Sequence, residues 1–162
     1  MSRLDSFIRR MQAQRTCLNW AAEAIGAVPG PVLELGLGNG RTYDHLREIL
    51  PDRDIYVFDR RIKAHPSSVP PDDRMILGDV EQTLPMMADR LGRTVAMVHT
   101  DLGTGVEEND GPLAALIGPW LEAVLRPGGV VVANHALPAG RLAQTQEPDG
   151  VRPGRYFLYR AE

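Results

Sequence analysis

Three glycines at alternate positions follow an apolar segment that ends next to an acid. The segment Val32-Leu33-Glu34-Leu35 leads into glycines at the first, third and fifth positions of residues 36–40. Because glycine has no Cβ, its backbone adopts positive φ values and lies directly against a ligand. The dinucleotide pattern G-x-G-x-x-G fails here, because its last position falls on Arg41 or Tyr43. The spacing predicts a ligand-binding loop and disfavours a nicotinamide enzyme.

An acidic residue that could accept hydrogen bonds from a sugar follows the second apolar segment. Asp59 closes residues 55–58 and lies 19 residues after Gly40. A carboxylate offers two acceptor oxygens, which match the two hydroxyls of a ribose. The alternative is a surface ion pair between Asp59 and Arg60 or Arg61.

Further polar residues follow the later apolar segments. Asp79 comes after the third and has two possible uses: ligand binding, or capping a helix that begins near Glu81. Asp101 comes after the fourth, and Asn134 and His135 come after the fifth. These groups are candidates for acid–base chemistry. His135 is a general base, a metal ligand or a loop histidine.

The elements that must position these residues alternate along the chain. Apolar segments at strand length alternate with segments of helical spacing, which predicts a mostly parallel sheet covered on both faces. Such a doubly wound sheet binds ligands at the carboxyl ends of its strands. Three prolines leave room for only a short helical turn in residues 60–73. The predicted strands are 32–35, 55–58, 75–77, 94–99, 130–133 and 156–159; the predicted helices are 4–25 (one helix, or two with Thr16 capping the second), 42–50, 81–91 and 112–125, and residues 136–155 are a polar, Gly/Pro-rich stretch.

Four motifs in this order resemble the class I S-adenosylmethionine-dependent methyltransferases. They are the acid-x-G-x-G-x-G loop at 34–40, Asp59, Gly78-Asp79-Val80, and the turn at 125–130. The resemblance covers residues 32 to about 135. It implies an α/β, Rossmann-like, doubly wound fold. The whole chain, 1–162, is then a single domain with an N-terminal helical segment (1–28), a cofactor-binding core (32–135) and a C-terminal loop and last strand (136–162).

The resemblance also implies S-adenosylmethionine as the cofactor. In this family an acid after the third strand accepts a hydrogen bond from the adenine amino group, and the next N–H meets a ring nitrogen. Glu34 would lie near the cationic amino group and sulfonium, unless it is a buried acid that binds amides of its own loop. The expected cofactor-binding residues are Glu34, Gly36, Leu37, Gly38, Asn39, Gly40, Thr42, Asp59, Arg60, Gly78, Asp79, Val80 and Asp101, and the expected catalytic residues are Asp101 and His135.

Methyl transfer from a sulfonium needs an in-line nucleophile and, for an oxygen or nitrogen acceptor, a base. Asp101, Asn134 and His135 also resemble the placement of magnesium ligands in catechol-type O-methyltransferases, which have acid-Asn where this chain has Asn-His. Losing that carboxylate weakens a site for a hard cation, so no metal is expected. A metal-assisted O-methyltransferase and a non-catalytic S-adenosylmethionine-binding module remain the alternatives.

The amino-acid composition limits the classes of binding partner that we expect for this protein. The net charge of −3 and the pI near 5.8 give no electrostatic footprint for nucleic acid, which favours a small-molecule acceptor. No apolar run approaches the ~18 residues of a membrane span. The single Cys17, expected in the core, fits a reducing compartment, so a cytoplasmic protein is expected. The N-terminal helix carries Arg10 and apolar residues, and three interpretations of it stay open. It presents a basic face to solvent, it covers the opening of the cofactor site, or it forms the surface of a homodimer.

Overall fold

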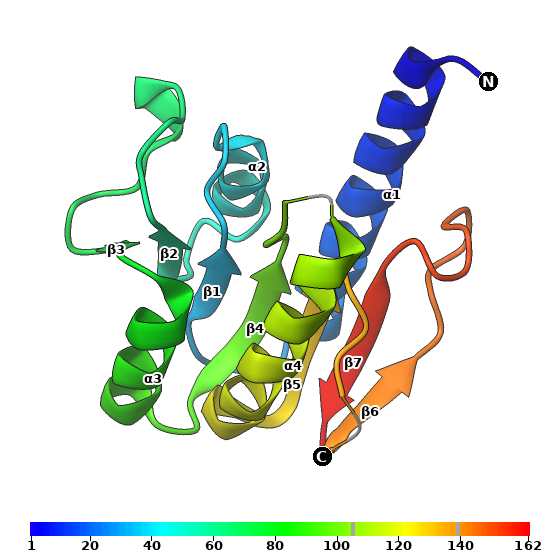
Figure 1. The fold of residues 1–162 in the computed structure, drawn as a ribbon. Helices are drawn as coiled ribbons and strands as arrows, with labels where there is room; N and C mark the ends of the chain where they lie inside the picture. The colour runs from blue at the N-terminus through cyan, green and yellow to red at the C-terminus, as the bar shows by residue number, and fades with distance from the viewer. Residues whose placement is uncertain (105, 139) are drawn as a thin grey trace.

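Seven strands form one sheet in the order β3-β2-β1-β4-β5-β7-β6 in the computed structural model (Figure 1). The structure describes residues 1–104, 106–138 and 140–162. Strands β1 to β5 are parallel to one another, whereas β7 is antiparallel to both β5 and β6. This confirms the doubly wound, Rossmann-like fold. The strands are β1 (Val32–Leu35), β2 (Ile55–Asp59), β3 (Met75–Leu77), β4 (Val95–Thr100), β5 (Leu125–Ala133), β6 (Leu142–Thr145) and β7 (Phe157–Ala161), and the helices are α1 (Arg3–Ala24), α2 (Arg41–Ile49), the 3-10 turn η1 (Pro66–Ser68), α3 (Val80–Leu91) and α4 (Glu107–Val124).

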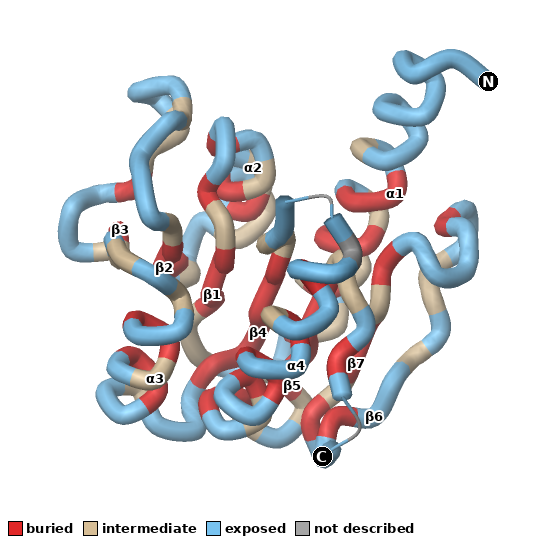
Figure 2. Tube along the Cα trace, in the orientation of Figure 1, coloured by how far each residue is buried: buried red, intermediate tan, exposed pale blue. Residues whose placement is uncertain are grey.

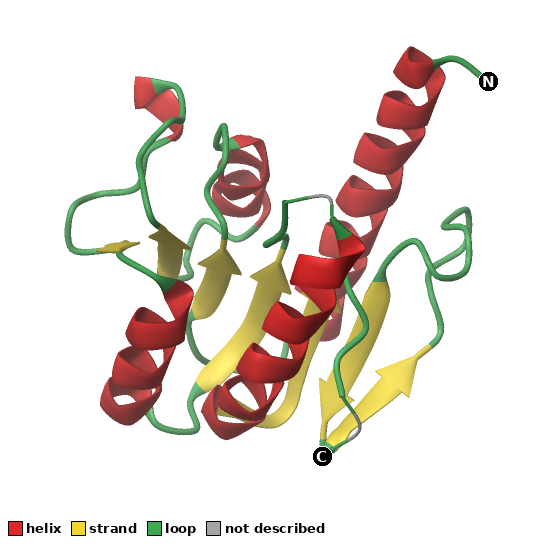
Figure 3. Cartoon of the chain, viewed as in Figure 1, coloured by secondary structure: helices red, strands yellow, loops and turns green. Residues whose placement is uncertain are grey.

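Helices cover both faces of the sheet, as its apolar strands require (Figure 3). On one face, α3 and α4 pack with Leu33, Leu35 and Val98 in one core cluster. On the other face, α1 and α2 pack over a second cluster that contains Val32 and Cys17. Burial raises the pKa of the Cys17 thiol to about 11. Cys17 is therefore a core residue, as the sequence predicts.

Helix α1 is one unbroken helix rather than two. Ser2 and Asp5 form a capping box at its start. The Thr16 hydroxyl donates to the carbonyl oxygen of Gln12 (3.0 Å), so it lies inside the helix and caps nothing. The first ten residues are exposed, and this end of α1 projects beyond the carboxyl edge of the sheet (Figure 2). A homodimer through its exposed apolar residues stays a prediction.

Two predicted boundaries and one prediction of irregular structure are wrong. Residues 142–145 form β6, an edge strand that pairs with β7. One residue of this strand is buried, so the sequence shows no strand-like apolar pattern. Helix α4 begins at Glu107 instead of Pro112, and β5 begins at Leu125 instead of Val130.

The winding of the sheet reverses between β1 and β4. These strands are neighbours in space, and the chain continues from them toward opposite edges of the sheet. Such a switch point leaves a crevice at the carboxyl ends of the two strands. Within the part of the chain that the structure describes, no helix has the length and apolarity to cross a bilayer.

Candidate functional site

Two cavities meet at the carboxyl ends of β1 and β4. The first has a volume of about 450 Å³ and is lined by the glycine loop 36–39, Asp59 and α1. The second has a volume of about 590 Å³ and lies on the side of β5 and β7, against residues that include His135. Arg10, Asp101 and Gly103 line both. The site therefore has two compartments with a common wall.

The glycines of the loop serve different purposes. Gly38 lines the first cavity with φ +53°, and a Cβ added there would meet no atom within 4 Å. Gly40 has φ +85°, and its added Cβ would lie 2.6 Å from Cβ of Ser68. Gly38 thus borders open space in the cavity, whereas Gly40 allows close packing before α2.

Asp59 holds the loop from the opposite wall. Its Oδ2 accepts hydrogen bonds from the backbone N–H groups of Leu37 (2.9 Å) and Gly38 (3.2 Å), and its Oδ1 accepts one from the N–H of Arg61 (3.2 Å). The alternative of an ion pair with a neighbouring arginine does not occur. The ribose role of Asp59 stays a prediction, and the carboxylate lies on the cavity wall where that role requires it.

Asp59→Ala is expected to weaken the binding of S-adenosylmethionine by about 1–3 kcal/mol, because the carboxylate accepts charge-assisted hydrogen bonds. Titration calorimetry measures this loss. An analogue without the ribose 2′-hydroxyl separates two causes. If Asp59 binds the ribose, the wild type binds the analogue more weakly than the natural ligand. The variant, which has already lost this contact, binds the two ligands with the same affinity. An equal loss in both proteins would limit Asp59 to holding the loop.

The predicted adenine end lies farther along the edge of the sheet. Asp79 forms an ion pair with Arg60 (2.7 Å), and both side chains are exposed. Asp79 occupies the N-cap position of α3, as the capping alternative predicts, but its carboxylate makes no capping hydrogen bond. Gly78 has φ +141°, and Val80 begins α3. The contacts of Asp79 and Val80 with adenine, and of Arg60 with the cofactor, stay predictions.

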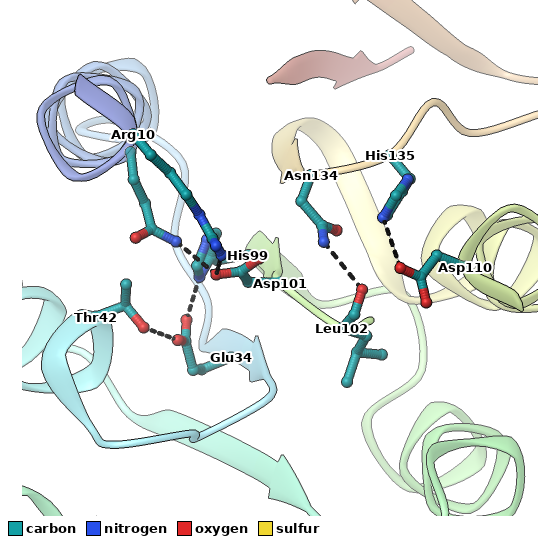
Figure 4. A network of polar contacts seen from close by, with 10 residues as sticks. Arg10, Glu34, Thr42, His99, Asp101, Leu102, Asp110, Asn134 and His135 are labelled. Carbon is teal, nitrogen blue, oxygen red and sulfur yellow. Dashed lines mark hydrogen bonds and ion pairs between the residues drawn. The ribbon is translucent and has the colours of Figure 1, made fainter. Parts of the chain in front are cut away.

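Glu34 lies under the glycine loop, fully buried, with both carboxylate oxygens engaged (Figure 4). The hydroxyl of Thr42, in the first turn of α2, donates to Oε1. The imidazole Nδ1 of His99 lies 2.6 Å from Oε2. Glu34 therefore joins β1, α2 and β4 at the base of the loop, and it binds side chains rather than amides of its own loop.

Helix α1 contacts the wall between the cavities at Asp101, the residue that follows β4. The side-chain amide of Gln14 donates to Asp101 Oδ2 (2.9 Å), and the guanidinium of Arg10 lies 3.4 Å away. Burial lowers the pKa of Arg10, but Asp101 and Tyr156 outweigh it and the pKa is raised. The pKa of Tyr156 is raised to about 12, mainly by burial and then by the Asp101 charge, so this hydroxyl keeps its proton. Among the three interpretations of the N-terminal helix, these contacts of α1 support the one in which it covers the opening of the cofactor site.

His135 lies in the second cavity with a buried carboxylate behind it. Its Nε2 is 3.5 Å from Asp110 Oδ2, and the Asp110 side chain is 3% exposed. Asp110 Oδ1 accepts hydrogen bonds from the backbone N–H (2.8 Å) and hydroxyl (3.2 Å) of Thr104. Sequence reasoning missed Asp110, which sits in an acidic run typical of a helix start.

Asn134, unlike its neighbour His135, contacts the backbone of the segment after β4. Its side-chain Nδ2 donates to the carbonyl oxygen of Leu102 (2.9 Å), which fixes the segment after β4 (Figure 4). No group of three or more metal-ligating side chains occurs among residues 1–104, 106–138 and 140–162. The arrangement provides one histidine with a buried carboxylate partner, one acid on the shared wall, and a glycine loop that lines the first cavity.

This sheet order, with a glycine loop at the switch point and acids after successive strands, defines a Rossmann-like methyltransferase. Residues 1–161 match the model of a family described as S-adenosyl-L-methionine methyltransferase. The chain belongs to this family; it is an S-adenosylmethionine-dependent methyltransferase, and S-adenosylmethionine is its cofactor.

One solved structure of high identity agrees with this assignment, and two more distant ones share the fold. An S-adenosyl-L-methionine methyl transferase from Silicibacter pomeroyi DSS-3 is 45% identical over 100% of this chain and 99% of that chain, with a TM-score of 0.95. MycE methyltransferase from the mycinamycin biosynthetic pathway, solved with Mg and S-adenosylhomocysteine, is 20% identical over 82% and 41% (TM-score 0.53). A probable spermidine synthase from Corynebacterium glutamicum ATCC 13032 is 16% identical over 92% and 63% (TM-score 0.60). The last two share the fold, and no curated protein matches this chain.

Proposed function

We propose that the enzyme transfers the methyl group in line to a small molecule held in the second cavity. The observation that carries this proposal is the common wall: Arg10, Asp101 and Gly103 line both cavities. A cofactor on the glycine loop would place its sulfonium at this wall, with the acceptor on the other side. Orientation at ~3–3.5 Å can contribute about 7–11 kcal/mol to lowering the barrier.

His135 is the proposed general base. Its Nε2 faces Asp110, so its Nδ1 is the nitrogen left to take a proton. As the acceptor oxygen or nitrogen forms its bond to the methyl carbon, the bond between that carbon and sulfur breaks, and its electron pair stays on sulfur. The acceptor proton moves to His135, and the buried Asp110 carboxylate stabilises the imidazolium. Asp101 is proposed to hold the cationic end of the cofactor.

His135→Asn is expected to lower methylation of hydroxyl acceptors by about 10²–10⁴-fold, the usual contribution of a general base. A panel of phenols, catechols and hydroxy acids with labelled S-adenosylmethionine provides the assay. His65→Asn is the matched control, because His65 lies in the proline-rich loop at the start of η1. Unchanged turnover in His135→Asn, on an acceptor that the wild type methylates, would contradict the role of His135.

The same assay tests the two alternatives. A metal-assisted enzyme would lose activity on chelation, whereas the proposed one keeps it. A protein that binds the cofactor but transfers no methyl group to any acceptor would be a binding module, contrary to what membership of the family indicates.

A further inference from the structure

Glu34 and His99 form a buried pair that the proposed chemistry does not use. The two residues lie opposite each other in the register of β1 and β4. Both side chains are 0% exposed, and Nδ1 of His99 is 2.6 Å from Oε2 of Glu34. The other ring nitrogen, Nε2, has no hydrogen-bond partner in the part of the chain that the structure describes. Such a pair is costly to bury, so its position needs an explanation.

The pair lies at the base of the cofactor cavity. Glu34 precedes Gly36 by two residues and holds the hydroxyl of Thr42, and both Gly36 and Thr42 line the first cavity. Any net charge on the pair therefore acts on a bound cofactor through little intervening solvent. Charges interact more strongly in such a place than in water.

The charge of the pair follows from its surroundings. Burial alone lowers the pKa of His99, but the adjacent Glu34 carboxylate outweighs it, and Asp101 adds to the effect, so the pKa lies above its ordinary value. Asp101 is itself ion-paired with Arg10 and bonded to the uncharged Gln14 on α1. On β5 the residue opposite His99 is the apolar Val132. The 2.6 Å contact between Glu34 and His99 and the raised pKa of His99 both favour an ion pair, which carries no net charge.

The two cofactor forms differ in charge. S-adenosylmethionine carries a sulfonium, an ammonium and a carboxylate, whereas S-adenosylhomocysteine has a neutral thioether in place of the sulfonium. A negative charge under the loop would favour the methyl donor over the product, and a neutral pair does not.

We infer that His99 is a positioning and specificity-determining residue of the cofactor site: its cationic imidazole fixes and neutralises Glu34, and so limits the preference for the methyl donor over the demethylated product. This inference rests on the cofactor of the family and is independent of the acceptor. It predicts that product inhibition depends on a residue that lines neither cavity.

The test compares His99→Asn with His65→Asn. Asparagine at position 99 retains a donor for Glu34 but carries no positive charge. At pH 7, calorimetry should show that His99→Asn raises the ratio of the dissociation constants of product and donor by about five- to thirty-fold, the effect of one unscreened charge at short range. His65→Asn should leave the ratio unchanged. A folded His99→Asn with a ratio within about twofold of the wild type would overturn the inference.

A second measurement uses the unmodified protein and decides the matter even if His99→Asn does not fold. Nitrogen-15 spectra of the wild-type imidazoles should show both ring nitrogens of His99 protonated at pH 7. Raising the pH through the elevated pKa of His99 should then raise the product-to-donor ratio of the wild type. A neutral His99 at pH 7, or a ratio that does not change as His99 loses its proton, would overturn the inference.

Discussion

Gly38→Asn is expected to leave the protein folded and to weaken the binding of S-adenosylmethionine and S-adenosylhomocysteine by about a hundredfold or more, or ~2.7 kcal/mol. Gly38 has φ +53°, a conformation that asparagine tolerates better than other residues with a Cβ. The new side chain would project into the first cavity, because no atom lies within 4 Å of its Cβ. Calorimetry with both ligands, together with the melting temperature, measures the effect.

Gly40→Ala is the matched control, and the expected result is the opposite. Its Cβ would lie 2.6 Å from Cβ and 2.8 Å from the carbonyl oxygen of Ser68. This contact and the strained φ should lower the melting temperature rather than act on the ligand directly. If Gly38→Asn folds and binds both ligands normally, the loop is not the contact surface for the cofactor.

His99→Leu is expected to lower the free energy of unfolding by about 3–5 kcal/mol, because it leaves the buried Glu34 carboxylate without its partner. Thr42 would still hold one oxygen, and the other would have no donor. Urea unfolding at pH 7 measures the loss. In a chain of this size each kcal/mol corresponds to about 2–4 °C in melting temperature.

The double variant Glu34→Leu/His99→Leu separates the cost of a broken pair from the cost of lost packing. Replacing both partners with apolar residues is expected to recover most of the stability, since an intact buried pair contributes little net free energy. The advantage of the wild type over the double variant should shrink as pH rises. A raised pKa in the folded state stabilises at low pH, and this contribution is lost as His99 releases its proton. A double variant no more stable than His99→Leu would contradict this account.

The sequence predicted the parallel part of the fold well because each strand there carries a strong local signal. Strands β1 and β3 have the predicted bounds, since each is a mostly apolar run flanked by turn residues. All four residues of β1 are buried, as is typical of a parallel strand covered on both faces. The antiparallel edge is different. Strand β6 depends on pairing with β7 across the eleven intervening residues 146–156, and its own four residues carry no pattern. Its existence follows from tertiary pairing.

In the site, too, some features could be predicted from local sequence and others depend on tertiary contacts. Acids at strand ends can be found by position alone, and Asp59 and Asp101 both line the first cavity. Pairings between distant residues cannot be found in this way. Asp110 meets His135 across 25 residues, and Glu34 meets His99 across 65. The register of β1 and β4 brings the second pair together, and a single sequence does not contain that register.

A crystal structure of the protein with S-adenosylhomocysteine would show where the cofactor lies relative to the two cavities. We expect the homocysteine sulfur to lie at the wall formed by Arg10, Asp101 and Gly103 and to face the second cavity, with the ribose hydroxyls against Asp59. A ligand bound away from the glycine loop, or a sulfur atom that faces away from the second cavity, would contradict it.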